Sequence, residues 1–427
     1  MLKKVLIISY YWPPSSGSGV QRWMYFGKYL AEFGVEPTLI TVDEKYASYP
    51  ARDTSFEKHV SHLRTFKTKT LEPIRFYSFL KSGKKDQIVP QGNLGSRKKG
   101  IIDKIATYVR GNFFIPDARV GWNRYAYQKA VELLKQEHFD LVITTGPPQS
   151  THLVGFKLKQ NLNVKWIADF RDPWTEVYYN NLFQRTKKNE AKDKAMELSV
   201  LKNADYVLTI GPSMKELLEN KIPEQKSKFH FIYNGYDQDL FLGKSKQKYP
   251  EFTIAHIGLW SKNQANTEII EALNTITKHQ PELKFRFVIA GTVDESIKEA
   301  LKSIPNVVLD DKGRVSHQEA IQEMLNADLL LNCFALSDIS KIMISGKLME
   351  YIASNNPIVV IGDKEGDAAN LLKEVPNGNV VSPNDVNTLI QIIENVIQNQ
   401  SIETNYKPEK YSRKNTTKEL ADWLKGI

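Results

Sequence analysis

The sequence predicts an α/β protein made of two doubly wound, Rossmann-like domains. Short apolar segments alternate with amphipathic helical segments along the chain, which is typical of parallel sheets covered by helices on both faces. This alternation fades around residues 239–249 and then starts again, and 427 residues are too many for one ordinary hydrophobic core. We therefore expect an N-terminal domain over residues 1–242, a C-terminal domain over residues 250–405 and a final helix over residues 406–427.

The predicted strands follow one another in a regular order. In the first domain they are KKVLIIS, PTLITVD, DLVITTG, VKWIADF, DYVLTIG and FHFIYN, and in the second they are TIAHIG, FRFVIAG, NVVLD, DLLLNC, PIVVIG and NVVS. Residues 46–112 are the least regular part of the chain. Ligands of such folds bind beyond the carboxyl ends of the strands, so we expect the site in a central cleft where the two domains face each other.

Composition narrows the class of protein. The formal net charge of +9 favours anionic partners such as phosphates, nucleic acid or a lipid surface. The single cysteine, Cys333, cannot form an internal disulfide, which fits a reducing compartment, and within LLLNC it is expected to be a buried apolar residue. No apolar run is long enough to span a bilayer and VLIIS is too short for a signal peptide, so we expect a cytoplasmic protein.

The stretch YYWPPSSGSGVQRW directly follows the first strand. Gly17 and Gly19 precede a predicted helix, where backbone N–H groups can approach a phosphate. A dinucleotide fingerprint is the competing hypothesis, but Arg22 stands where its third glycine belongs. Asp43, at the end of the second strand, fits the acidic residue of that fingerprint, and a plain turn is the third interpretation.

A second candidate site is the segment ISGKLMEYIASNNPIVVIG. Ser345 and Gly346 are expected to begin a helix whose first turn carries Lys347, a combination that favours a diphosphate. Glu350 lies three residues after Lys347 on the same helix face, where its carboxylate can accept hydrogen bonds from a ribose diol. The alternative is an ordinary pair of surface charges.

Charged residues also follow two strands of the first domain. Asp169, Arg171 and Asp172 end the strand in WIADFRDPWTE, and charges there are costly unless they are paired or functional. A structural ion pair is the competing interpretation. His152 opens a helix after the turn in TTGPPQSTHLVG, where a capping or packing role is the alternative. The segment PDARVGWN is expected to bring two more residues to the same end of the domain, Asp117 and Trp122.

The segment DDKGRVSHQEAI follows a strand of the second domain. Gly313 favours a turn, and Ser316 with Glu319 matches a capping box at the start of a helix, which leaves His317 as a first-turn residue. The loop is placed where a nucleobase can be recognised, by Gly313, Arg314 and Val315.

These motifs together resemble the retaining glycosyltransferases of family 4, which have the GT-B fold. The segments that carry the resemblance occur in that family's order over almost the whole chain: the glycine-rich loop, GPPQSTH, DFRDPW, ADYVLTIGPSM, IYNGYD, GRVSH and GKLMEYIASNNPIVV. DFRDPW together with GPP is typical of bacterial members that build surface polysaccharides.

The resemblance implies a hexosyltransferase that takes a UDP- or GDP-linked sugar as donor and a glycan or a polyprenyl-linked molecule as acceptor. The donor diphosphate would meet Gly17 and Gly19 on one side and Ser345, Gly346 and Lys347 on the other. Glu350 would hold the ribose. The last helix would return to the first domain, which is the acceptor domain with Asp117, Trp122 and Asp172 on its acceptor side.

The sequence departs from the family pattern in three places. Ile342 replaces the first acid of the usual pair of glutamates, and GLWSKNQAN offers Lys262 without the usual arginine. The family's histidine near the reacting sugar has no clear counterpart in this sequence. The candidates for the catalytic role are His152, Asp169 and Arg171. The segment DQD, residues 237–239, lies at the domain linker and is not expected to bind metal, so we expect neither a metal nor another cofactor.

Rival functions remain open at the level of sequence. They are another GT-B enzyme (a nucleotide-sugar epimerase or a phosphorylase), an NAD-dependent dehydrogenase, and a basic nucleic-acid-binding protein. The basic residues follow no nucleic-acid-binding motif, so no nucleic-acid partner is expected. The basic segment Lys81–Arg110, with aromatic residues at its edges, predicts docking on the anionic inner face of the plasma membrane, and a solvated loop is its alternative.

Overall fold

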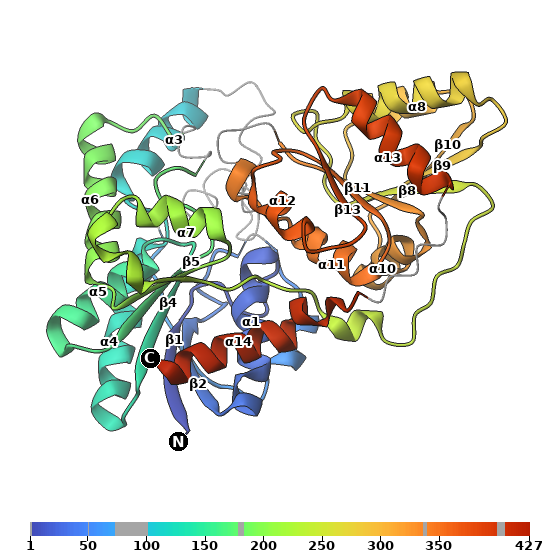
Figure 1. The fold of residues 1–427 in the computed structure, drawn as a ribbon. Coiled ribbons are helices and arrows are strands. Elements are labelled where there is room, and N and C mark those ends of the chain that lie inside the picture. The colour runs from blue at the N-terminus through green and yellow to red at the C-terminus, as the bar shows by residue number, and fades with distance from the viewer. Residues whose placement is uncertain (1, 50, 73–100, 178–182, 336–339, 399–405) are drawn as a thin grey trace. The chain divides into compact units, whose positions relative to one another are not determined.

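The computed structural model describes residues 2–49, 51–72, 101–177, 183–335, 340–398 and 406–427 (Figure 1). The chain divides into two compact units. The N-terminal unit holds residues 1–233 and 417–427, and the C-terminal unit holds residues 234–416. Each unit contains a parallel sheet with flanking helices, which confirms the predicted α/β fold class.

The sheet of the N-terminal unit has the strand order β3-β2-β1-β4-β5-β6-β7. Its strands are β1 (Lys3–Ile8), β2 (Val35–Val42), β3 (Arg64–Thr68), β4 (Leu141–Gly146), β5 (Trp166–Phe170), β6 (Tyr206–Thr209) and β7 (Phe229–Phe231). Its helices are α1 (Ser18–Leu30), α3 (Ile101–Phe113), α4 (Asn123–Gln136), α5 (Thr151–Leu162), α6 (Lys187–Asn203) and α7 (Pro212–Glu219). Strand β3 was not among the expected strands, because RTFKT is a polar edge strand without an apolar run.

The last helix, α14 (Arg413–Gly426), packs into the core of the N-terminal unit. Its apolar residues Leu420, Ala421 and Leu424 are buried in the same cluster as β1 and α1. The Lys3 ammonium group donates to the carbonyl of Leu424 over 2.6 Å, which ties the helix to the start of β1.

The sheet of the C-terminal unit has the order β10-β9-β8-β11-β12-β13. Its strands are β8 (Phe252–Ile257), β9 (Phe285–Ala290), β10 (Val307–Gly313), β11 (Leu329–Cys333), β12 (Ile358–Ile361) and β13 (Gly378–Val381). Its helices are α8 (Thr267–His279), α9 (Glu295–Lys302), α10 (His317–Asn326), α11 (Gly346–Ser354), α12 (Asp367–Leu372) and α13 (Val386–Gln398).

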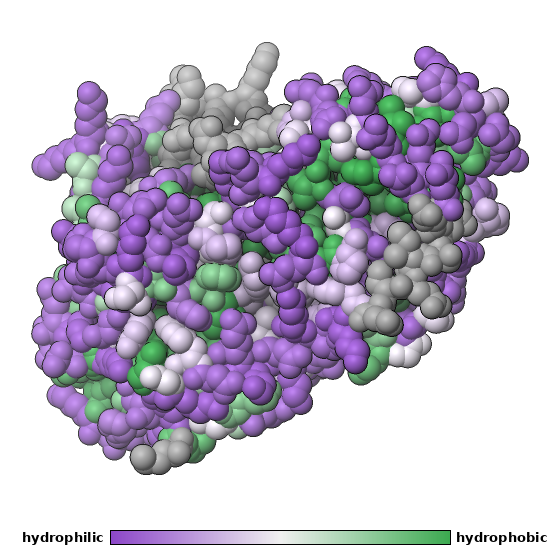
Figure 2. Space-filling model, in the orientation of Figure 1, coloured by the Kyte–Doolittle hydropathy of each residue, from purple (hydrophilic) through white to green (hydrophobic). Residues whose placement is uncertain are grey.

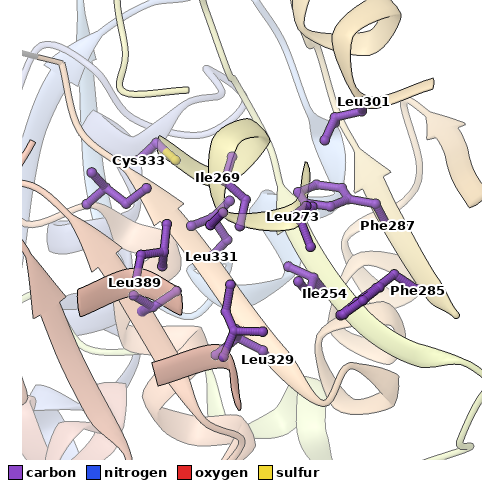
Figure 3. Close-up of a cluster of buried hydrophobic side chains, with 14 of the residues drawn as sticks. Ile254, Ile269, Leu273, Phe285, Phe287, Leu301, Leu329, Leu331, Cys333 and Leu389 are labelled. Atoms are coloured by element: carbon purple, nitrogen blue, oxygen red, sulfur yellow. The ribbon is translucent and has the colours of Figure 1, made fainter. Parts of the chain in front are cut away.

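Apolar side chains of the central strands and of α8 and α13 form the core of this unit. Figure 3 shows Phe287 and Leu331 from the sheet beside Leu273 and Leu389 from the helices. Cys333 belongs to this cluster, and burial raises the pKa of its thiol well above the ordinary value. The cysteine is therefore an apolar packing residue, as its sequence context predicts.

In both sheets, the direction in which successive strands are added reverses at one point. The reversal lies between β1 and β4 in the N-terminal unit and between β8 and β11 in the C-terminal unit. Ligands of open parallel sheets bind outside the carboxyl ends of the strands at such points. The loops after these four strands are therefore where a site is expected in each unit.

No helix among the described residues combines the length and the apolar character that crossing a bilayer requires. The face seen in Figure 2 is largely hydrophilic, with hydrophobic areas between the hydrophilic side chains.

Candidate functional site

In the C-terminal unit, the N-terminus of α11 is open. Ser345 is its N-cap, and the Ser345 hydroxyl accepts from the amide of Leu348 over 3.2 Å. The Asn332 side chain on β11 donates to the same hydroxyl over 2.9 Å, which fixes the cap. The amides of Gly346 and Lys347 have no partner within the helix, and no atom of the described residues lies within 4 Å of a Cβ built on Gly346. The helix start predicted at this motif is confirmed, and it can accept an anion.

Lys347 adds a cation to this helix start. A Cβ atom built on Gly258 would lie 2.6 Å from the Lys347 Nζ, so the ammonium group lies directly over the carboxyl end of β8. Gly258 has a φ of 105°, which a residue with a side chain rarely adopts. Burial lowers the pKa of Lys347, and its Nζ has no hydrogen bond or ion pair with the residues that the structure describes. An anionic ligand would supply the missing partner.

Three glycines with positive φ end the adjacent strands β8, β9 and β10. Gly258, Gly291 and Gly313 are joined by backbone hydrogen bonds: Thr292 N donates to Gly258 O over 3.1 Å, and Gly291 N donates to Gly313 O over 2.6 Å. The predicted nucleobase loop of Gly313, Arg314 and Val315 therefore lies at the same sheet edge as Gly258. Lys262, in the loop after β8, is exposed and stays a predicted phosphate ligand.

Glu350 is already held by a partner that sequence reasoning missed. The Glu350 Oε1 lies 2.7 Å from the Nε2 of His317, the first residue of α10. The capping box of Ser316 and Glu319 in front of His317 is present as predicted. The position of His317 in GRVSH was a signal, but nothing local in the sequence pointed to Glu350. The predicted bond from Glu350 to a ribose stays a prediction.

In the N-terminal unit, Asp169 at the end of β5 forms a buried ion pair with Arg22 of α1. The Arg22 Nη2 lies 3.1 Å from the Asp169 Oδ1, and neither side chain is exposed by more than 1%. The Asp169 Oδ2 also accepts from Trp23 Nε1 over 2.6 Å and from Thr145 over 2.8 Å. Arg22 is the residue that replaces the third glycine of the dinucleotide fingerprint, so this pair explains the departure from that motif.

Arg171 lies beside the glycine-rich turn. Its Nε donates to the carbonyl of Gly146 over 3.0 Å, and its Nη2 donates to the carbonyl of Pro147. Its Nη1 is buried without a partner among the described residues and lies 3.5 Å from where a Cβ on Gly19 would be. Gly17, with a φ of 112°, is the N-cap of α1. The structure thus brings Gly17, Gly19 and Arg171 together at a second helix N-terminus.

His152 is buried inside the N-terminal unit. Its ring stacks on Phe170 at 4.4 Å between centroids, and its Nδ1 lies 2.9 Å from the hydroxyl of Thr144. That hydroxyl accepts from Trp166 Nε1 and so can give its own hydrogen to Nδ1, which leaves the ring proton on Nε2. Burial lowers the pKa of His152 to about 3, so the imidazole is neutral. It has no exposed surface for a substrate to reach.

The residues predicted for the acceptor side have different surroundings. The carboxylate of Asp117 accepts from the amide and the hydroxyl of Ser150 over 2.7 and 2.8 Å. The buried Trp122 donates to Thr68 over 2.7 Å, and Asp172 is exposed. Asp117 lines a pocket of the N-terminal unit, but Trp122 and Asp172 do not. The pocket is also lined by Phe114, Pro147, Pro148, Trp174, Phe183 and Arg185.

Two further predictions concern the linker and the basic segment. The Asp237 carboxylate accepts from the amide of Asp239 over 3.1 Å as the cap of a short helix, η6 (Gln238–Phe241). Within the described parts of the chain, no three His, Cys, Asp or Glu side chains are grouped so that they could hold a metal. Residues 73–100, which carry most of the predicted membrane segment, lie outside the described residues.

Comparison with known proteins agrees with this architecture. The family model described as Glycosyltransferase Family 4 matches residues 89–240, and the model described as Glycosyl transferases group 1 matches residues 251–399. The sequence finds no match among curated proteins.

Solved structures are similar to the chain over its whole length. The apo form of the lipopolysaccharide outer core galactosyltransferase WaaB has 12% identity and a TM-score of 0.57, with 99% of each chain covered. TarM has 12% identity and a TM-score of 0.53, covering 99% of this chain and 95% of its own. The N-terminal domain of the Candida albicans trehalose-6-phosphate phosphatase has 13% identity and a TM-score of 0.54, covering 98% of this chain and 95% of its own. At such identities the likeness shows the fold alone. Together with the two family models, it places the chain among the glycosyltransferases with the GT-B fold.

Proposed function

We propose that this glycosyltransferase moves a hexosyl group from a UDP- or GDP-linked donor to a hydroxyl of a glycan or polyprenyl-linked acceptor, with retention of configuration. In this proposal the enzyme builds a bacterial surface polysaccharide, works at the inner face of the plasma membrane and needs no metal. The family models support the transferase. The finer statements rest on the site residues, on the DFRDPW and GPP motifs and on the basic segment Lys81–Arg110.

One observation carries the donor assignment. Lys347 is a half-buried cation with no hydrogen bond or ion pair to the residues that the structure describes. It lies at the N-terminus of α11, over the end of β8 at the switch point of the C-terminal sheet. An unpaired buried charge is costly, and a diphosphate would offset that cost. Its negative charge grows as the sugar departs, so Lys347 and the amides of Gly346 and Lys347 would bind the transition state more tightly than the ground state.

The remaining site residues receive roles that fit their surroundings. Glu350 accepts hydrogen bonds from the ribose, residues 313–315 contact the base, and Lys262 is a further phosphate ligand. Gly17, Gly19 and the Arg171 Nη1, which has no partner in the described part of the chain, form an anion-binding group on the N-terminal unit. Asp169 and His152, which are both buried and engaged, are better suited to fixing the β5 and β4 loops than to touching the sugar.

Retention follows in this proposal from a reaction on one face of the sugar. A departing phosphate oxygen takes the proton of the acceptor hydroxyl while the bond from C1 to the phosphate breaks and the bond from C1 to the acceptor oxygen forms. The acceptor binds through the N-terminal unit, with Asp117, Trp122 and Asp172 as the predicted residues on that side.

The donor assignment is tested by nucleotide binding. Calorimetry with UDP and GDP should show binding of one of them, and Lys347→Met should weaken it about tenfold or more, as expected for losing a hydrogen bond to a charged group. Lys278→Met, a change of an exposed lysine at the end of α8, should leave affinity unchanged. Failure of both nucleotides to bind, or full affinity in Lys347→Met, would contradict the assignment.

Membrane association is tested separately. The described end of α3 exposes Tyr108, Val109 and Phe113 beside Arg110, which is consistent with a lipid-facing segment. Vesicles with anionic lipid should sediment the protein at low salt, and binding should fall as salt rises, because each basic residue near the surface contributes about 1 kcal/mol and is screened. Glutamate in place of Arg97, Lys98 and Lys99 should release the protein while nucleotide binding stays. Equal sedimentation by neutral vesicles would argue against the membrane role.

A further inference from the structure

The contact between His317 and Glu350 joins the two helices that border the donor site. His317 is the first residue of α10, and Glu350 lies in the second turn of α11. The His317 Nε2 lies 2.7 Å from the Glu350 Oε1, a short distance typical of a charge-assisted hydrogen bond. By its position in the sequence, His317 is only the first residue after the N-cap Ser316.

Further hydrogen bonds hold the two helices that carry this contact. The capping box fixes the start of α10, because Ser316 N donates to Glu319 Oε2 over 2.8 Å and Glu319 N donates to Ser316 Oγ over 3.3 Å. Near the C-terminal ends of the two helices, the Asn356 side chain after α11 donates to the carbonyl of Met324 on α10 over 2.7 Å. The imidazole therefore meets the carboxylate from a fixed direction.

Among the residues that the structure describes, only one carboxylate oxygen of Glu350 has a hydrogen-bond partner. The hydrogen bond to His317 takes Oε1, and Oε2 has no hydrogen bond to any residue that the structure describes. Glu350 lies three residues after Lys347, so the free oxygen and the ammonium group share one face of α11. A nucleotide whose diphosphate met Lys347 would have its ribose one helical turn further along this face.

We propose that His317 is a positioning residue for the donor: it holds Glu350 Oε1 so that Oε2 accepts a ribose hydroxyl. This inference rests on the proposed donor site. It deepens that site by naming the group that fixes the ribose-binding carboxylate. The ligand class is a nucleotide with an intact ribose diol.

Charges around His317 give the arrangement a pH dependence. The hydrogen bond to Glu350 raises the pKa of His317, with Asp237 before η6 adding to the effect and Arg413 at the start of α14 opposing it. Below the raised pKa the imidazolium and the carboxylate attract each other. As pH rises through that pKa the charge is lost, so Glu350 is held less firmly and the ribose contact weakens.

The test compares ribose and deoxyribose nucleotides on the intact enzyme. His317→Ala should weaken binding of UDP or GDP, whichever binds, about tenfold, which corresponds to one hydrogen bond to a charged group. Binding of the matching 2′,3′-dideoxy diphosphate should change little, because it lacks the hydroxyls that Glu350 accepts. His317→Gln keeps an N–H donor but no charge and should restore part of the affinity, and His279→Gln on the exposed end of α8 is the matched control.

The same measurement repeated across pH gives a second readout. The preference of the wild-type enzyme for the ribose nucleotide over its dideoxy form should decline as pH rises above the ordinary histidine pKa of about 6.5 and through the raised pKa of His317, and His317→Gln should show no such decline. Equal loss of both nucleotides in His317→Ala, full affinity in that variant, or a flat wild-type preference would each overturn the inference. If Lys347→Met weakens binding while His317→Ala does not, the inference alone fails. If no nucleotide binds, the proposed function fails first.

Discussion

Arg22 and Asp169 show how single residues define the N-terminal unit. The guanidinium group of Arg22 also donates to the carbonyls of Ile232 and Thr209, over 2.8 and 3.2 Å. One buried ion pair therefore ties α1 to the carboxyl ends of β5, β6 and β7. Removing one partner of such a pair leaves the other charge without compensation, which is far more costly than losing an exposed pair.

At the residue scale, we predict that Asp169→Ala lowers the stability of the N-terminal unit by about 3–5 kcal/mol, because Arg22 would remain buried without its counter-charge. Denaturant unfolding followed by tryptophan fluorescence measures the change. Asp172→Ala, a change of the exposed neighbour, should have little effect. A stable Asp169→Ala variant that lost turnover would instead support the catalytic role expected from the sequence.

In the glycine-rich turn, we expect Gly17 to matter for stability and Gly19 for nucleotide binding. Gly17→Ala should destabilise the protein by about 1–3 kcal/mol, because the φ of 112° and ψ of 164° at this position suit glycine alone. Gly19→Ala should be tolerated, because the added carbon meets Arg171 only at an ordinary contact distance of 3.5 Å. Thermal unfolding of both variants measures this difference. The hypothesis of a phosphate at this turn further requires that Gly19→Ala weaken nucleotide binding; unchanged binding in a stable variant would remove Gly19 from the site.

At the scale of elements, α14 belongs to the core of the N-terminal unit although it ends the chain. Leu420 and Leu424 have no exposed surface there. We predict that Leu424→Ala lowers the free energy of unfolding by about 2–5 kcal/mol, the usual cost of removing a buried leucine side chain. Lys418→Ala on the exposed face of the helix should change it by less than about 0.5 kcal/mol. Equal midpoints for the two variants in denaturant would contradict the burial of this helix.

At the scale of the whole molecule, each unit carries one buried neutral histidine. Burial lowers the pKa of His152 and of His256 to about 3, whereas an unfolded histidine titrates near about 6.5. Between these values the unfolded chain binds more protons than the folded chain. Stability should therefore fall as pH decreases below about 6.5, by at most about 1.4 kcal/mol per pH unit for each histidine.

Thermal midpoints measured between about pH 7 and about pH 5 check this prediction. His256→Gln should flatten the decline, because its pKa difference between the two states is removed. His279→Gln, with an exposed side chain, should leave the slope unchanged. A decline that both variants share with the wild type would assign the acid sensitivity to other groups.

The sequence by itself determined the strands, the helix starts and the residues at the open N-terminus of α11. Apolar runs, the capping box at Ser316 and the cap at Ser345 are local signals, because they depend on neighbours within a few residues along the chain. Strand β3 was not predicted, because a polar edge strand has no apolar run in its sequence.

Only the tertiary structure decided the partners of the charged residues. His317 and Glu350 are 33 residues apart and Arg22 and Asp169 are 147 residues apart, so no local pattern links them. The same is true of Gly258, whose missing side chain makes room for Lys347. A lone charge in a sequence has many allowed partners, and burial next to one of them in the folded chain selects which pair forms.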